Sequence, residues 1–125
     1  MAEVSERKKR EPGPDHPIAI EPSTEQHSVT VAGKVIASSE QALVLREADY
    51  PPVLYFPEED VDFDALSPTD HSSYCPYKGE ANYYSVPAGG ARAENAVWQY
   101  RAAYPAVAAI EGHLAFYPDR VDSID

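Results

Sequence analysis

The residues Cys75-Pro76-Tyr77-Lys78-Gly79 lead into Ala81-Asn82-Tyr83-Tyr84-Ser85-Val86, and the fold that we expect extends outward from these two runs. The second run is rich in strand-forming residues and stops at Pro87-Ala88-Gly89-Gly90, so it predicts a β-strand that ends in a turn. Successive side chains of a strand point to opposite faces of its sheet. We therefore expect Tyr83 and Tyr84 on opposite faces.

Further short apolar runs predict further strands. Residues 96–100, Ala-Val-Trp-Gln-Tyr, form one of them, and alternation places Trp98 and Tyr100 on one face of it. Residues 28–31 and 34–37 flank Ala32-Gly33 and predict a hairpin. Strands are also expected over 53–56 and 113–117, and over 41–47, where alternation favours a strand although propensity would allow a helical turn.

Two segments predict short helical turns. One follows Pro57, and the other begins at Pro105 and ends at Gly112, an order of residues that is typical of a helix start and a helix end. The fold class is therefore mainly β, with antiparallel sheets packed as a small tent-like or barrel-like single domain and one or two helical turns.

The chain of 125 residues suits one domain with one core. Its first residues are charged, and Pro12, Pro14 and Pro17 are too closely spaced for a helix or a paired strand. We expect a disordered charged tail over residues 1–15 and the single domain over residues 16–125.

Acidic residues dominate and give a formal net charge of −11. From Pro12 onward, 18 acidic residues face six basic ones, so we expect no duplex nucleic acid as a partner. The basic run Arg7-Lys8-Lys9-Arg10 could contact an acidic partner, but a solvated terminus is its simpler interpretation.

Cys75 is the one cysteine, so it can form neither an intrachain disulfide nor a zinc site of paired cysteines. No apolar signal segment follows Met1, and no run of 18 apolar residues occurs. We expect a cytoplasmic protein without a membrane segment or a bound metal, and the sequence defines no cofactor.

An ordered series of motifs resembles the signature of the bacterial family called domain of unknown function 427. Its centre is Cys75-Pro76-Tyr77-Lys78-Gly79, Ala81-Asn82-Tyr83-Tyr84 and Ala96-Val97-Trp98-Gln99-Tyr100. On either side lie His16-Pro17-Ile18, Gly33-Lys34-Val35-Ile36-Ala37, Leu45-Arg46-Glu47, Tyr55-Phe56-Pro57-Glu58-Glu59-Asp60-Val61 and Ile110-Glu111-Gly112-His113-Leu114-Ala115-Phe116-Tyr117.

This resemblance implies a β fold whose antiparallel sheets lean together, similar to the tent-like ligand-binding domain of cereblon, and a nucleotidyltransferase-like label. Tent-fold relatives often hold zinc through paired cysteine motifs. With Cys75 alone, this chain cannot supply them, so the metal is not carried over. Kinship of fold does not define a reaction.

Lys78 is the main candidate for ligand binding, because its ammonium precedes Gly79, where backbone can come close to an anion. It could bind a ligand phosphate or carboxylate, or form an ion pair with an acid such as Glu47. Cys75 is either a nucleophile activated by His71 or Lys78 or a small buried side chain, and we favour the structural role. His71 is either a proton acceptor or a structural histidine.

Nine tyrosines are a high load for a small core, because each buried hydroxyl needs a partner. Core packing would explain them, and so would a surface on which a planar ligand stacks. We expect a concave site between sheets. Its floor would contain Tyr77, Lys78, Trp98 and Tyr100, with Glu47, Tyr55 and His71 as partners.

Asp60, Asp62 and Asp64 would share one face of a strand, as a two-metal site for nucleotidyl transfer requires. Pro57 and the acids that follow it favour a solvated acidic turn instead. A Walker-type Gly-Lys motif is also missing from the sequence.

Two main functions follow from these residues. The first is the binding of a small planar or anionic molecule, such as a nucleotide-like one, by aromatic stacking and by Lys78. The alternative is an enzyme acting on a nucleotide-like substrate, with His71 or a carboxylate as proton acceptor and Lys78 stabilising developing negative charge. An interaction protein that uses the basic tail is a third class, and the oligomeric state is not defined by the sequence.

Overall fold

The computed structural model describes residues 8–125, and most of its regular structure is β. The strands are β1 (Ile18–Pro22), β2 (His27–Val31), β3 (Lys34–Ser39), β4 (Leu43–Glu47), β5 (Val53–Tyr55), β6 (Ser67–Cys75), β7 (Gly79–Ser85), β8 (Val97–Gln99), β9 (Leu114–Phe116) and β10 (Ser123–Ile124). Between them lie the 3-10 helices η1 (Glu58–Asp60), η2 (Phe63–Ala65), η3 (Pro87–Ala93), η4 (Pro105–Ile110) and η5 (Pro118–Arg120). The predicted mainly β class is confirmed.

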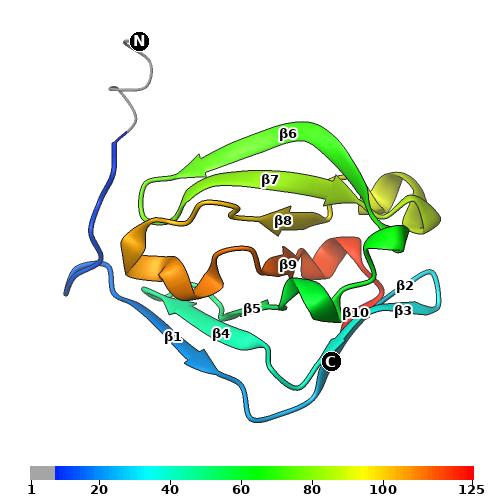
Figure 1. The fold of residues 1–125 in the computed structure, drawn as a ribbon, viewed down its shortest axis with the longest axis horizontal. Helices are drawn as coiled ribbons and strands as arrows, with labels where there is room; N and C mark the ends of the chain where they lie inside the picture. The colour runs from blue at the N-terminus through cyan, green and yellow to red at the C-terminus, as the bar shows by residue number, and fades with distance from the viewer. Residues whose placement is uncertain (1–7) are drawn as a thin grey trace.

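The strands form three antiparallel sheets, in the orders β1-β4-β5, β10-β2-β3 and β6-β7-β8-β9. The first and the last sheet are joined, because Phe56 and Leu114 exchange two backbone hydrogen bonds, of 2.7 and 2.8 Å. Figure 1 shows the seven strands stacked from β6 to β1, with β9 beside β5. We call this junction of Phe56 with Leu114 the ridge, since the two sheets meet there.

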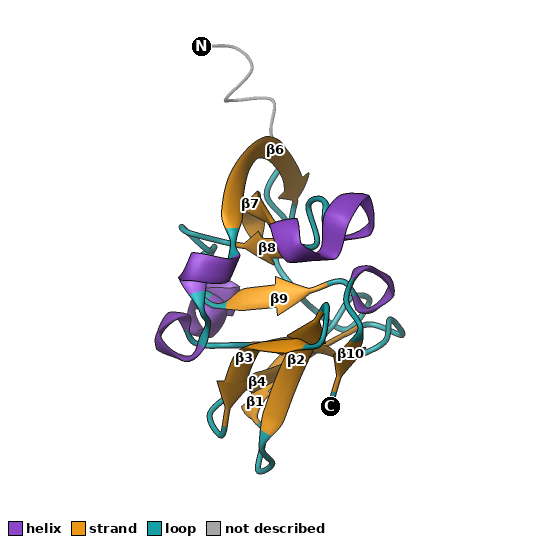
Figure 2. Ribbon diagram, turned by 90° about the vertical axis from the view of Figure 1, so that its right-hand side faces the viewer, coloured by secondary structure: helices purple, strands orange, loops and turns teal. Residues whose placement is uncertain are grey.

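Alternation along β7 and β8 divides the core into two clusters, with Tyr83 and Tyr84 on opposite faces as the sequence predicts. Tyr84 and Val97 pack in the cluster that includes Phe56, and this cluster is covered by β2 and β3. In Figure 2 the sheet of β2, β3 and β10 lies below β9. Tyr83 and Trp98 pack in the other cluster, between the two joined sheets.

The local predictions for the hairpin and the helical turns are confirmed. β2 and β3 pair across Ala32 and Gly33, whose φ angles of 52° and 77° are those of a two-residue hairpin turn. The segment over 41–47 contains β4, as its alternation indicated. Helical turns occur after Pro57, as η1, and from Pro105, as η4.

Three strands were not predicted from the sequence, β1, β6 and β10. β6 runs over Ser67–Cys75, where polar residues leave no alternation to detect, and most of these residues are exposed. It lies at the edge of its sheet, and its pairing with β7 shifts in register between Pro68 and Ser72. An edge strand of this kind is held by backbone pairing and not by burial of its side chains.

The predicted tail over residues 1–15 falls partly outside the described residues, which begin at Lys8. The described part lies against β6 and the turn that follows it. The Tyr74 hydroxyl donates to the Lys8 carbonyl at 2.6 Å, and the Arg10 N–H donates to the Pro76 carbonyl at 2.9 Å. The N-terminal segment therefore reaches the Cys75–Gly79 turn before β1 begins.

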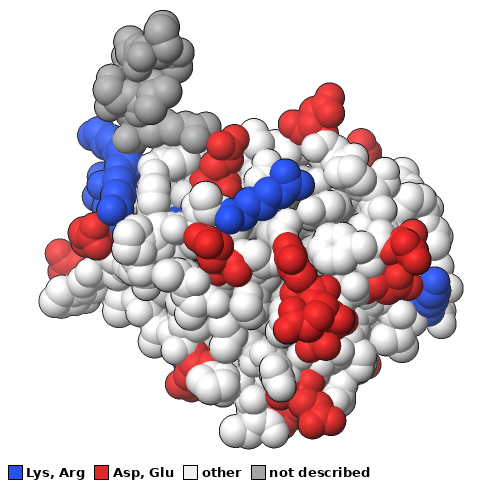
Figure 3. All heavy atoms as spheres, in the orientation of Figure 1, with Lys and Arg blue, Asp and Glu red and all other residues white. Residues whose placement is uncertain are grey.

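Acidic side chains are spread over the face of the molecule seen in Figure 3, with one denser group right of centre and few basic groups. This distribution agrees with the acidic composition. No helix within residues 8–125 combines the length and the apolar character that a membrane crossing requires.

We expect the fold to be most sensitive to side-chain truncation at the ridge. Phe56 is fully buried, and its ring meets Phe116 edge-on at 5.6 Å. We expect Phe56→Ala to lower the free energy of unfolding by about 3–5 kcal/mol, measured by urea denaturation. Phe63, on η2, is 39% exposed and serves as the control, since Phe63→Ala should cost clearly less. Equal losses for the two variants would contradict a special role for the ridge.

Candidate functional site

A cavity of about 450 Å³ lies between the two joined sheets, on the side that carries Tyr83 and Trp98. Its wall is mainly aromatic and aliphatic. The aromatic residues are Tyr50, Tyr55, Tyr83, Trp98, Tyr100 and Tyr117. Two charged residues, Glu47 and Lys78, also line it. We take this aromatic cavity as the candidate site.

Lys78 and Glu47 form an ion pair on the wall of the aromatic cavity. The side chains are 9% and 14% exposed, so the pair is largely withdrawn from water. The second carboxylate oxygen of Glu47 lies 2.7 Å from Nε2 of His16. Lys78 therefore forms the ion pair with Glu47 that the sequence allowed, and it also lines the cavity in which a ligand could bind.

The charge of Glu47 reflects two opposing effects. Burial alone would raise the pKa of this carboxyl group, but the hydrogen bonds from Lys78 and His16, together with their charges, outweigh it. The net result is a pKa below the ordinary value of 4.5. Glu47 is therefore an anion at neutral pH, matched to the lysine ammonium.

Backbone geometry fixes Lys78 at the cavity wall. Cys75 and Gly79 pair as the ends of β6 and β7, and the Lys78 N–H donates to the Cys75 carbonyl at 3.2 Å. Gly79 has a φ of +113°, and a Cβ at this position would lie 3.2 Å from the carbonyl oxygen of Ala102. A glycine is needed there, because other residues rarely adopt this conformation and the space is also closed. The Lys78 carbonyl then accepts from the N–H of Tyr104.

The tyrosine hydroxyls of the aromatic cavity differ in their hydrogen bonding. Tyr83 bonds to Ser73 at 2.8 Å and to Tyr117 at 3.3 Å. The Trp98 indole N–H donates to the Tyr55 hydroxyl at 3.4 Å. Within residues 8–125, the Tyr100 hydroxyl has no hydrogen-bond partner, and no fully buried side-chain polar atom lacks one. The Tyr100 hydroxyl therefore opens onto the cavity.

Burial keeps these hydroxyls neutral. It raises the pKa of Tyr55 and of Tyr100 well above the ordinary value of 10.0. Burial, with the hydrogen bond to Tyr83, raises the pKa of Tyr117 to about 12. Each of these groups can thus donate a hydrogen bond at neutral pH.

Trp98 forms the aromatic centre of the cavity. Its ring lies 4.5 Å from that of Tyr117 in a tilted arrangement and meets Tyr55 edge-on at 6.3 Å. Tyr100 lies on the same side of the strand as Trp98, as the alternation predicted, and both residues line the cavity.

The structure brings together five of the residues that the sequence proposed for ligand binding, namely Glu47, Tyr55, Lys78, Trp98 and Tyr100. Tyr77 is not part of the cavity wall, because its ring stacks on that of His16 at 4.0 Å. His71 lies outside the wall as well. Its ring contacts the Tyr83 ring at 4.4 Å, on the exposed edge strand β6.

Cys75 is half-buried beside the cavity but does not line it. Its Sγ lies 3.8 Å from Nζ of Lys78, and it packs against the cluster of Tyr83 and Trp98. This placement agrees with the structural role that we favoured.

Several residues of the site were not proposed from the sequence, and among them His16 and Tyr50 matter most. Residues 16 and 50 lie far from the Cys75–Gly79 run, and their rings meet edge-on at 6.3 Å. His16 belongs to one of the motifs that resemble the family signature, but the motif alone did not indicate a role for it. Tyr83 could have been found, since it pairs across the strands with Trp98.

The acids Asp60, Asp62 and Asp64 lie away from the aromatic cavity, in and between η1 and η2. Asp62 accepts a hydrogen bond from the backbone of Asp64 and pairs with Lys34 at 3.4 Å. They form the acidic turn that the sequence favoured. No group of three or more His, Cys, Asp or Glu side chains that could hold a metal is found within residues 8–125.

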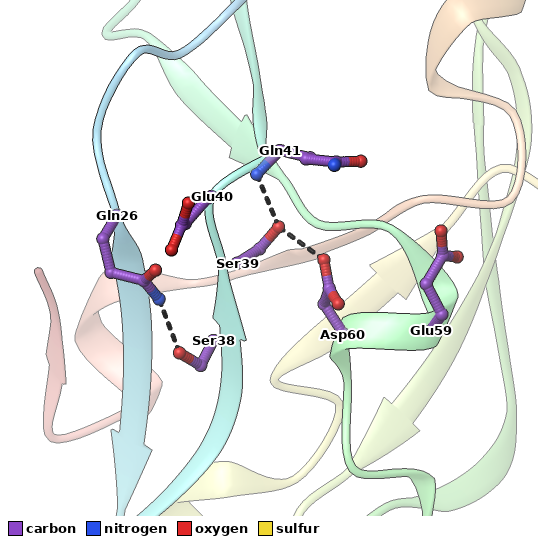
Figure 4. A pocket seen from close by; sticks show the side chains of 7 residues that line it. All are labelled: Gln26, Ser38, Ser39, Glu40, Gln41, Glu59 and Asp60. Carbon is purple, nitrogen blue, oxygen red and sulfur yellow. Dashed lines mark hydrogen bonds between the residues drawn. The ribbon is translucent and has the colours of Figure 1, made fainter.

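A second hollow, of about 460 Å³, lies where β3 ends near η1 (Figure 4). Polar side chains line it and bond to one another. The Ser39 hydroxyl donates to Asp60 at 2.6 Å and accepts from the Gln41 N–H, and Gln26 donates to Ser38. The Ser39–Asp60 bond joins β3 to η1. Because these polar side chains bond to one another, their presence in the hollow needs no ligand to explain it.

Together these features define a class: small mainly β domains with an aromatic cavity that contains one lysine–glutamate pair. The chain belongs to the family described as domain of unknown function (DUF427), whose model matches residues 19–125 and carries a nucleotidyltransferase label. The resemblance inferred from the motifs is thereby confirmed. No curated protein matches the chain.

The lowered pKa of Glu47 predicts a pH dependence of stability. A carboxyl group whose pKa is lower in the folded than in the unfolded protein stabilises the fold above its unfolded value, here near 4.5. This contribution is lost as the pH falls through the folded-state pKa. We expect the melting temperature of the unmodified protein to fall more steeply than that of Glu47→Gln from about pH 5 to about pH 3.

Glu21→Gln is the matched control, because Glu21 is an exposed acid of the neighbouring strand β1. Its melting temperature should follow the unmodified protein through the same range. If Glu47→Gln follows it as well, Glu47 does not carry the stabilising charge.

Proposed function

We propose that this domain binds a small planar molecule in the aromatic cavity. The observation that carries the proposal is the combination of six aromatic side chains with one partly desolvated Lys78–Glu47 pair around about 450 Å³. Ligand cavities commonly have volumes of about 300–1,000 Å³ and walls that are mostly apolar with a few polar groups. The cavity fits this description with room for a ligand of one or two rings.

Two features favour a binding site over a purely structural cluster. Protein cores are packed closely, so a hollow bounded by this many aromatic rings leaves contacts unmade. The Tyr100 hydroxyl is the second feature, because it has no protein partner within residues 8–125 and is therefore available to a ligand. A planar ligand would supply contacts to the rings and a hydrogen-bond partner for this hydroxyl.

The rim supports the same proposal. Tyr50 lines the cavity yet is 61% exposed, and Pro51 and Pro52 follow it directly. Two successive prolines restrict the backbone and hold Tyr50 at the opening. An aromatic residue held in water at the mouth of a cavity is placed to cover a bound ring.

Catalysis on a nucleotide-like substrate receives less support from these residues. Glu47 has a lowered pKa and accepts bonds from two cations or donors, which makes it a poor proton acceptor. His71 does not line the cavity, and neither do Asp60, Asp62 and Asp64. We therefore propose binding and take the nucleotidyltransferase label as a family name.

The single tryptophan gives a direct test, because Trp98 is the only one in the chain and lines the cavity. We expect its fluorescence to change in a saturable way when a planar compound binds, in titrations with nicotinamide and adenosine, and we expect binding of indole, which fluoresces itself, to be seen by ligand-observed NMR. Tyr50→Ala should weaken binding roughly two- to tenfold, the value of one aromatic contact of about 0.5–1.5 kcal/mol.

Phe63→Ala is the control for that variant, since Phe63 is a part-exposed aromatic residue of the opposite cluster, packed on Tyr84. It should leave the binding curve unchanged. Lack of saturation with all three compounds would count against the proposed function, and so would equal weakening by both variants.

A further inference from the structure

The polar end of the aromatic cavity carries no net charge, and its two charged groups already contact each other. From this geometry we infer that the ligand is neutral at the point where it meets Lys78 and Glu47. A carboxamide-type group on a planar ring is the chemistry that fits, and a carboxylate or phosphate is disfavoured there. This inference rests on the proposed function and narrows the class of ligand.

Charge balance is the first step. Of the residues that line the cavity, Lys78 is the one cation and Glu47 the one anion, and they form an ion pair. His16 contacts the second carboxylate oxygen of Glu47 but does not line the cavity, and Arg120, which lies over the ring of Tyr117 at 5.1 Å, does not line it either. An incoming anion therefore meets a lysine whose charge is already compensated.

Repulsion is the second step. A ligand carboxylate that accepted a hydrogen bond from Nζ of Lys78 would also lie close to the carboxylate of Glu47, which contacts the same Nζ. Like charges repel strongly where both are partly withdrawn from water, and the ligand would also lose its own hydration. A neutral group avoids both costs.

Hydrogen-bonding capacity is the third step. An ammonium has three donors, and within residues 8–125 Lys78 directs one to Glu47 and a weak one to the sulfur of Cys75. Glu47 accepts from Lys78 and His16, and carboxylate oxygens have further lone pairs. One donor and one acceptor thus remain side by side. The carbonyl and the N–H of an amide are complementary to this pair.

Tyr100 adds a further group with the same preference. Its hydroxyl opens onto the cavity and, like that of an ordinary tyrosine, is neutral at neutral pH. A neutral hydroxyl can donate to a carbonyl or accept from an amide N–H, so it adapts to either orientation of the ligand.

Nicotinamide and nicotinate test the inference, because they have the same ring and differ in the charge of one substituent at neutral pH. We expect nicotinamide to bind the unmodified protein at least about tenfold more tightly than nicotinate, in titrations followed by Trp98 fluorescence and by ligand-observed NMR. Equal or tighter binding of nicotinate would overturn the inference while leaving the proposed function in place.

Glu47→Gln should change this preference, since it leaves the lysine charge uncompensated. The ratio of the two affinities should shift toward nicotinate by about tenfold or more. Glu21→Gln removes the same charge from an exposed site on β1, where the acid pairs with Arg46, and should leave the ratio unchanged. An unchanged ratio in Glu47→Gln would also overturn the inference.

The melting curve of Glu47→Gln shows whether this variant folds. If it does not fold, Lys78→Met is used in its place. Without the ammonium, nicotinamide should bind more weakly, and undiminished binding would refute the role of Lys78. If indole or adenosine binds and nicotinamide does not, the carboxamide assignment fails. If none of these compounds binds, the proposed function itself fails.

Discussion

The pair of backbone hydrogen bonds between Phe56 and Leu114 is the constraint on which the site depends. It joins the sheet β1-β4-β5 to the sheet β6-β7-β8-β9, so that β4 with Glu47 faces the turn that carries Lys78. The ring of Phe56 then fills the opposite cluster against Phe116. One junction thus separates the two clusters of the core, and the aromatic cavity lies on the side of Tyr83 and Trp98.

Within that cavity, the Lys78–Glu47 pair controls the chemistry more than either residue does alone. A buried lysine without a partner would lose its charge or stay exposed, and a buried glutamate would do the same. In the pair, the two opposite charges compensate each other, so little net charge faces the cavity. His16 holds the second carboxylate oxygen of Glu47 in place. Under the proposed function, a site of this kind would recognise hydrogen-bonding pattern and shape rather than charge, although the protein as a whole is strongly acidic.

The sequence predicted those parts of the fold and the site that depend on local alternation and on turn chemistry. The hairpin at Ala32-Gly33, the opposite faces of Tyr83 and Tyr84, and the common face of Trp98 and Tyr100 all follow from the period of a strand. β6 could not be predicted, because most of its residues are polar and exposed, so that backbone pairing with β7 places it in the sheet and no hydrophobic pattern marks it. Tyr77 was proposed for the site as a neighbour of Lys78, but His16 stacks on it from the N-terminal segment, a contact that no local pattern encodes.

That same contact links the N-terminal segment to the cavity. The ring of His16 stacks on Tyr77, and its Nε2 contacts Glu47. Nearby, the Arg10 N–H donates to the Pro76 carbonyl, and the Lys8 carbonyl accepts from the Tyr74 hydroxyl. The segment before β1 therefore braces the Cys75–Gly79 turn on one side, and the hydrogen bond from the Tyr104 N–H to the Lys78 carbonyl holds it on the other. Lys78 is held from both sides, so its ammonium is positioned before any ligand arrives. Preorganisation of this kind lowers the entropy cost of binding, so it would favour the binding of the small, neutral ligand that we propose.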